Sequence, residues 1–138
     1  MAEPTLFDVS GDDLLISVFR RQGRTLDDLP YTAEFESLYA AVGDVMGDRG
    51  AVFHRLHNLR KAGRLPRMGR AASAPPRIAP AQEAVLVTLV ERAVGALSRR
   101  DQLVYAPAFD ELVAAFNSEA GLNLSAHDVW RIVAKLAK

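Results

Sequence analysis

Cysteine is absent from the 138 residues of this chain, which excludes disulfide bridges, cysteine-based zinc sites and thiol catalysis. Long apolar runs are absent as well, since none approaches the ~20 residues that a membrane-spanning helix needs. The first residues, Met1 to Asp8, lack the basic and apolar regions of a signal peptide. We therefore expect a cytoplasmic protein with no membrane partner.

The usual sequence signatures of catalysis are missing too. The chain has no phosphate-binding loop, no dinucleotide-binding glycine motif and no nucleophile elbow. Asp12/Asp13 and Asp27/Asp28 are poor candidates for paired catalytic acids, because adjacent residues on a helix point in different directions. Asp12 and Asp13 are better explained as negative charge at the start of a helix. The sequence predicts no enzyme and no cofactor.

A metal site is equally poorly supported. His54 and His57 lie three residues apart, a spacing that can place both rings on one helix face. No carboxylate occurs between Ala51 and Gln82, so any further ligands would have to come from distant segments. We therefore predict no bound metal.

Net charge is also lacking, because 17 Lys and Arg residues balance 17 Asp and Glu residues. Resolved along the chain, the charge is −6 in residues 1–50, +7 in residues 51–77 and −1 in residues 78–138. Residues 51–77, which we call the basic segment, contain no acid at all. This asymmetry is typical either of a solvated helix face followed by a basic linker or of a surface that binds phosphate. The cations of the basic segment are Arg55, Arg60, Lys61, Arg64, Arg67, Arg70 and Arg77.

An apolar pattern recurs between the two halves of the chain. The spacing i, i+3, i+4, i+7 indicates an amphipathic helix in each copy, and a second helix follows. Thr32, Asp48 and Ser125 are good N-cap residues, and Pro107 suits the first helical position. At an offset of 74, Leu29, Tyr31, Phe35, Leu38, Tyr39 and Val42 align with Leu103, Tyr105, Phe109, Leu112, Val113 and Phe116. At an offset of 77, Val52, Phe53, Leu56 and Leu59 align with Val129, Trp130, Val133 and Leu136.

Each copy is preceded by a further apolar helical stretch, from about Asp12 to Gln22 and from about Ala81 to Leu97. The strand signal is poor, so we predict an all-α fold of two repeated three-helix units joined by a Pro/Gly-rich basic linker. A short β wing after the first unit remains an open alternative. Because each unit is small, we expect the two to pack together as one compact domain. The predicted division is residues 1–70, a linker over 71–80, and residues 81–138.

The predicted outer face of the third helix in the first unit is rich in hydrogen-bond donors. Arg and Lys neutralise phosphates or bind guanine, and Asn can pair with adenine through two hydrogen bonds. The corresponding face in the second unit is weaker, with Arg131 and Lys135 as its cations. In the first unit the candidate residues are His54, Arg55, His57, Asn58, Arg60 and Lys61.

The segment from Leu56 to Arg70 resembles the end of a winged helix-turn-helix domain, in which L-x-x-L-x-x-x-G-x-[LI] closes the recognition helix. The resemblance covers about residues 32–70. It implies binding to double-stranded DNA with the helix Val52–Ala62 in the major groove. Pro66 is a poor strand residue, which favours a helix-turn-helix without a full wing. The resemblance also implies that Arg64, Arg67 and Arg70 lie near the DNA backbone or minor groove.

These observations lead to one leading hypothesis and one alternative. The leading hypothesis is a DNA-binding transcriptional regulator or mobile-element accessory factor, which can also form a homodimer. If about six cations meet phosphate, the logarithm of affinity should fall with the logarithm of salt concentration with a slope of roughly −5. The alternative is a helical protein-interaction module or RNA-binding adaptor with no preference for duplex DNA. The helix Ala81–Leu97 would serve dimerisation or docking, unless it is buried against the first unit.

Overall fold

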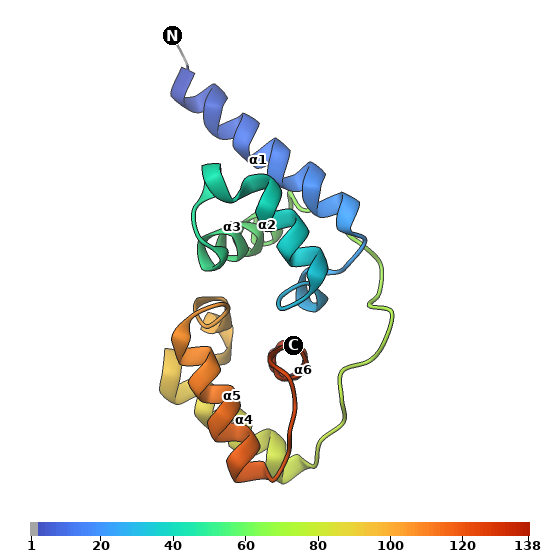
Figure 1. Ribbon diagram of the computed structural model, residues 1–138, viewed down its shortest axis with the longest axis vertical. Coiled ribbons are helices and arrows are strands. Elements are labelled where there is room, and N and C mark those ends of the chain that lie inside the picture. Colours follow the sequence, from blue (N-terminus) through green and yellow to red (C-terminus); the bar gives the residue numbers. More distant parts are fainter. Residues whose placement is uncertain (1–2) are drawn as a thin grey trace. The chain divides into compact units, whose positions relative to one another are not determined.

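A computed structural model describes residues 3–138 of the chain, with side chains from Gly11 onward. The described chain is helical with connecting coil and has no strand, which confirms the all-α prediction. The expectation that no signal peptide is present concerns Met1 to Asp8 and so falls partly outside the described residues. No helix in the described part of the chain is long and apolar enough to cross a membrane. The chain divides into two compact units, Met1–Arg70 and Ala71–Lys138 (Figure 1).

The first unit consists of α1 (Glu3–Gln22), the short 3-10 helix η1 (Leu26–Asp28), α2 (Ala33–Met46) and α3 (Arg49–Lys61). Helix α2 packs against both α1 and α3. Burying one apolar stripe from each helix produces the core of this unit. Its buried apolar residues are Leu15, Val18, Phe19, Leu26, Leu29, Phe35, Leu38, Val42, Val52, Phe53, Leu56 and Leu59.

The starts of α2 and α3 are fixed by the caps that the sequence predicted. The backbone N–H of Phe35 donates to Thr32 Oγ1 at 3.1 Å, and that of Ala51 donates to Asp48 Oδ1 at 2.8 Å. Between the two helices, Gly47 has φ of 108° and ψ of −156°, a conformation essentially restricted to glycine. The two-residue connection thereby sets the direction in which α3 leaves α2.

Helix α3 ends at a left-handed glycine. Gly63 has φ of 73°, and the backbone N–H of Arg64 donates to the carbonyl oxygen of Leu59 at 2.9 Å, as in a Schellman motif. Residues 64–79 then contain no helix and no strand, so the predicted option of a β wing is wrong. Pro66 has no N–H to donate to a strand ladder, and no second strand is present in the described chain to pair with this segment.

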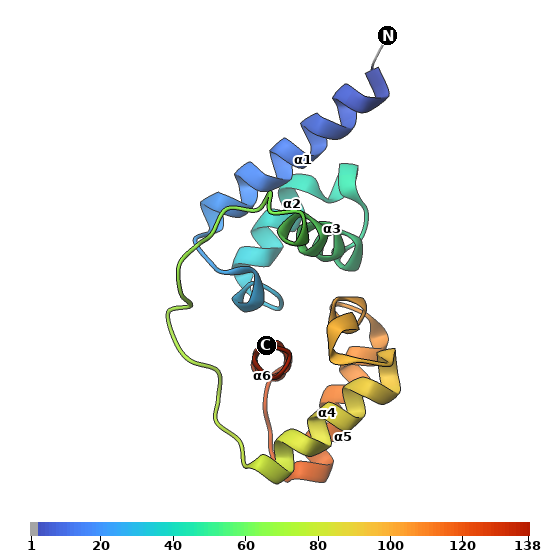
Figure 2. The same cartoon turned by 180° about the vertical axis from the view of Figure 1, so that it is seen from behind.

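The second unit contains α4 (Pro80–Val94), the 3-10 helix η2 (Leu97–Gln102), α5 (Pro107–Ala120) and α6 (Ala126–Leu136). Helices α4 and α5 run side by side in both views, and α6 contacts α4, α5 and η2 (Figures 1 and 2). The rings of the buried residues Phe109 and Trp130 meet edge to face, with centroids 6.2 Å apart. The other buried apolar residues are Leu86, Val90, Leu103, Val104, Leu112, Phe116, Val129, Ile132, Val133 and Ala134.

Side-chain hydrogen bonds shape the α5–α6 connection. Ser125 caps α6 by accepting from the N–H of Asp128 at 3.1 Å, and Pro107 stands in the first turn of α5, as predicted. Asn117 clamps the backbone of Leu124, because its amide donates to the Leu124 carbonyl and accepts from the Leu124 N–H, both at 2.9 Å. These contacts hold the chain between α5 and α6 in one conformation.

Two predicted helix boundaries are wrong. Helix α1 begins at Glu3, so Asp12 and Asp13 lie inside the helix and not at its N-terminus. Helix α4 ends at Val94, because Gly95 adopts φ of 93°, and the stretch that follows forms η2. The consequence for Asp12 is that its carboxylate projects from the middle of a helix, where a partner from elsewhere in the fold can reach it.

Candidate nucleic-acid interface

Helix α3 is held by its buried stripe and presents a mixed polar face. Val52, Phe53 and Leu56 are fully buried, and Leu59 is nearly so. The capped N-terminus and the glycine at the C-terminus fix both ends of the helix. On the side away from the core, His54, Arg55 and Lys61 are exposed, whereas Asn58 and Arg60 are half-buried.

Arg55 and Arg64 converge on a single carboxylate. Arg55 donates through Nε to Asp12 Oδ1 at 2.8 Å and through Nη2 to Asp12 Oδ2. Arg64 donates through Nη1 to the same Oδ2 at 3.3 Å. The Asp12 side chain is only 7% exposed, while those of Arg55 and Arg64 are 44% and 45% exposed. The cluster therefore joins a buried negative charge in α1 to two cations that still reach solvent.

The ionisation of Asp12 follows from this geometry. The hydrogen bond from Arg55 is the largest influence and lowers the pKa of Asp12, and the charges of Arg55 and Arg64 act in the same direction. Desolvation raises the pKa but is outweighed. Asp12 is therefore an anion near neutral pH, and it takes up positive charge that the basic segment would otherwise present.

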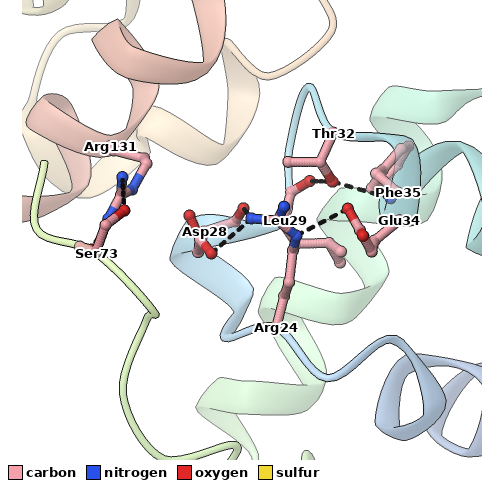
Figure 3. A network of polar contacts seen from close by, with 8 residues as sticks. All are labelled: Arg24, Asp28, Leu29, Thr32, Glu34, Phe35, Ser73 and Arg131. Atoms are coloured by element: carbon pink, nitrogen blue, oxygen red, sulfur yellow. Dashed lines mark hydrogen bonds and ion pairs between the residues drawn. The ribbon is translucent and has the colours of Figure 1, made fainter.

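A second carboxylate engages Arg60. Asp27, in η1, accepts from Arg60 Nη1 at 3.1 Å. Next to it, Arg24 bridges Asp28 at 2.8 Å and Glu34 at 2.9 Å, which ties η1 to the start of α2 (Figure 3). The acidic N-terminal half of the first unit thus pairs with three of the six cations that run from Arg55 to Arg70.

His57 does not lie on the outer face, and the prediction that it does is wrong. Its side chain is buried, with 4% of the residue exposed, and its ring stacks on Phe53 with centroids 6.3 Å apart. Its Nδ1 lies 3.4 Å from Arg60 Nη2. Position 57 follows Phe53 by four residues, so it lies on the flank of the apolar stripe. Burial removes His57 from the surface that a ligand can reach.

His54 and Asn58 form a pair on the face that remains accessible. Asn58 Nδ2 lies 3.2 Å from His54 Nε2, one helical turn away. Both residues are therefore placed on the same side of α3 as Arg55. This side offers amide, imidazole and guanidinium groups within one turn of helix.

The remaining cations of the basic segment within the first unit are exposed and have no carboxylate partner among the described residues. They are Lys61, at the end of α3, and Arg67 and Arg70, in the coil that follows. The coil alternates in exposure, because its arginines are exposed while Leu65, Pro66 and Met68 are half-buried. Its apolar residues and rim arginines border a groove of about 720 Å³ whose other walls include Phe19, Thr25, Leu26 and Arg60.

The two candidate residues of the second unit differ from each other. Lys135 is exposed, but Arg131 is buried, with 7% of the residue exposed, and the prediction that it lies outside is wrong. Its guanidinium donates to Ser73 Oγ at 3.3 Å and to the Ser73 carbonyl oxygen (Figure 3). Arg131 therefore fastens the coil before α4 to α6 within the second unit.

Sequence reasoning missed Asp12 and Asp27, which shape the charge of this face. The only signal in the sequence was the acidic block followed by the basic block, which is compatible with charge pairing between them. No group of three or more potential metal ligands gathers within the described residues. No protein-family model, curated protein or solved structure matches the chain.

Proposed function

We propose that the first unit binds double-stranded DNA through the outer face of α3 and the coil that follows it. The observation that carries this proposal is the exposed set Lys61, Arg67 and Arg70, which has no carboxylate partner among the described residues. These cations continue directly from a helix whose orientation is fixed by its core. The short connection between α2 and α3 is of the kind found in helix-turn-helix proteins, in which the second helix enters the major groove.

Two kinds of contact follow from the chemistry of these side chains. Lys61, Arg67 and Arg70 neutralise phosphates and set the position of the protein on the duplex. His54 and Asn58 lie on the face of α3 that would meet base edges, where an asparagine can form two hydrogen bonds to adenine. Affinity would come mainly from the first group, and sequence preference from the second.

The test is fluorescence anisotropy of a labelled mixed-sequence duplex at two salt concentrations. Lys61→Ala, Arg67→Ala and Arg70→Ala are combined in one variant, and the control removes two exposed cations from the last turn of α1, Arg20→Ala with Arg21→Ala. We expect the triple variant to bind at least about tenfold more weakly, with a log–log salt slope shallower by roughly 2.7, because three phosphate contacts are lost. The control should change little. No binding by the unsubstituted protein, or equal losses in both variants, contradicts the proposal.

We also propose that the two units are copies of one three-helix arrangement, joined by the coil between them. In support, α2 and α5 each have 14 residues and begin 74 residues apart. Tyr31 and Tyr105, at the same offset, both have positive φ, at 65° and 61°, which is rare for a bulky residue. An experimental structure in which these two tyrosines differ in backbone conformation would contradict the repeat.

The alternative is a module that binds RNA or an acidic protein. One observation favours this alternative: Arg55 and Arg60 of α3 already bind carboxylates, those of Asp12 and Asp27. A competition in which single-stranded RNA or an acidic peptide displaces labelled duplex at equal charge concentration would support this alternative. Selective competition by unlabelled duplex DNA supports the proposed function.

A further inference from the structure

Two carboxylates lie within the surface proposed to bind phosphate. Asp12 contacts Arg55 and Arg64, and Asp27 contacts Arg60. The six cations from Arg55 to Arg70 therefore carry a net charge of four when these two anions are counted with them. A third of the positive charge is cancelled within the protein itself.

A phosphate must compete with Asp12 for Arg55 and Arg64. Asp12 accepts two hydrogen bonds from Arg55 and one from Arg64, and its side chain is 7% exposed while both arginines lie over it. Turning both arginines to phosphates would break three charge-assisted hydrogen bonds at once, so Asp12 retains part of their positive charge. Since the carboxylate stays in place, it also repels a phosphate that approaches the pair.

We propose that Asp12 and Asp27 are specificity-determining residues that hold the affinity of this face for arbitrary DNA low. The inference rests on the proposed DNA binding. By cancelling part of the sequence-independent attraction to phosphate, the two carboxylates increase the share of the binding free energy that depends on base edges. They act through the arginines and need not touch DNA themselves.

The inference predicts a value for the log–log slope of affinity against salt concentration. With about four effective cations, the log–log slope for a random-sequence duplex should be roughly −3.6, at about 0.9 per phosphate contact. Replacing either aspartate by asparagine frees one cation and should steepen the slope by roughly 0.9. One more phosphate contact at about 0.1 M salt corresponds to a gain in affinity of roughly fivefold to tenfold.

The experiment measures binding of a random-sequence duplex by Asp12→Asn, Asp27→Asn and the control Asp13→Asn in the full chain. Asp13 is the next residue of α1, is exposed, and has no ion pair to a described residue, so its substitution removes the same formal charge without freeing an arginine. We expect both Asp12→Asn and Asp27→Asn to bind more tightly with a steeper slope, and Asp13→Asn to change affinity less than about twofold. A purely structural role for Asp12 would not steepen the slope.

The outcomes separate the two proposals. If the protein binds duplex DNA but Asp12→Asn and Asp13→Asn change its affinity and salt slope equally, the proposed role of the carboxylates is overturned. The proposal of DNA binding then stands. Absence of binding by every variant overturns both. If Asp12→Asn fails to fold by circular dichroism, Asp27→Asn alone decides the matter, because its partner Arg60 is 36% exposed and remains solvated without it.

Discussion

Two glycines of the first unit should respond to alanine with opposite signs. Gly63 has φ of 73° at the end of α3, and a Cβ atom there would meet no atom within 4 Å. The cost of Gly63→Ala is therefore backbone strain alone, about 1–2 kcal/mol for an L-residue in the left-handed region. The lower entropy of the unfolded chain offsets about 0.4–1 kcal/mol of this. We expect Gly63→Ala to lower the free energy of unfolding by about 1 kcal/mol.

Gly11 lies inside α1, where alanine is the better residue. A Cβ atom at this position would lie 3.8 Å from Met46 Sδ, an ordinary van der Waals contact. Gly11→Ala should therefore raise the free energy of unfolding by about 0.5–1 kcal/mol. The pair of variants separates a conformational effect from a general effect of adding a methyl group.

The assay is urea unfolding followed by far-ultraviolet circular dichroism. With an unchanged slope m, the midpoint should fall for Gly63→Ala and rise for Gly11→Ala, each by a few tenths of a molar to about 1 M. A neutral or stabilising Gly63→Ala would refute the left-handed end of α3 on which the course of the arginine-bearing coil depends. A destabilising Gly11→Ala would refute the continuity of α1 through that position.

Two further predictions concern acid stability and the second unit. Hydrogen bonds from Arg55 and Arg49 lower the pKa values of Asp12 and Glu36, respectively. The stability that these two ionised carboxylates contribute is fully present above the ordinary pKa values of 3.8 and 4.5. It is lost as the pH falls through their lower pKa values in the folded protein. An acid titration by circular dichroism should therefore show Asp12→Asn to be less sensitive than the unsubstituted protein below about pH 3.8, and identical curves would contradict this. Asn117→Ala removes both hydrogen bonds to Leu124 and should cost about 1–3 kcal/mol, measured by urea unfolding with Trp130 fluorescence as the probe. An unchanged midpoint would show that the clamp does not stabilise the second unit.

Much of the helical framework was predictable because it depends on local chemistry. The N-caps at Thr32, Asp48 and Ser125 act within three residues, and the apolar stripes repeat with the helical period. The turn at Gly63 and the lack of a strand pattern are likewise visible from neighbouring residues alone. These features required no knowledge of the tertiary fold.

The errors arose where distant residues decide the outcome. Asp12 looked like a helix start, but its arginine partners lie 43 and 52 residues later in the sequence, so nothing local shows that it belongs inside a helix. Arg131 looked exposed on the helical wheel, yet it donates to Ser73, which lies 58 residues earlier. His57 was the exception, since its spacing of four from Phe53 already placed it beside the stripe.

The charge of the candidate site changed most between sequence and structure. The basic segment alone led to an expected salt slope of roughly −5 for about six phosphate contacts. Ion pairs with Asp12 and Asp27 reduce the net charge of the six cations to four and the expected slope to roughly −3.6. Charges summed along a segment overstate the field that a ligand meets when another segment of the same fold supplies counter-charges.

DNA binding by the first unit is best tested through the affinity of the unsubstituted protein for duplex DNA between about 50 and 200 mM salt. We expect measurable binding at the lower concentration and a log–log slope of roughly −3.6. Absence of binding at low salt, or a slope near zero, would contradict the proposal that the exposed cations of α3 and the following coil bind phosphate.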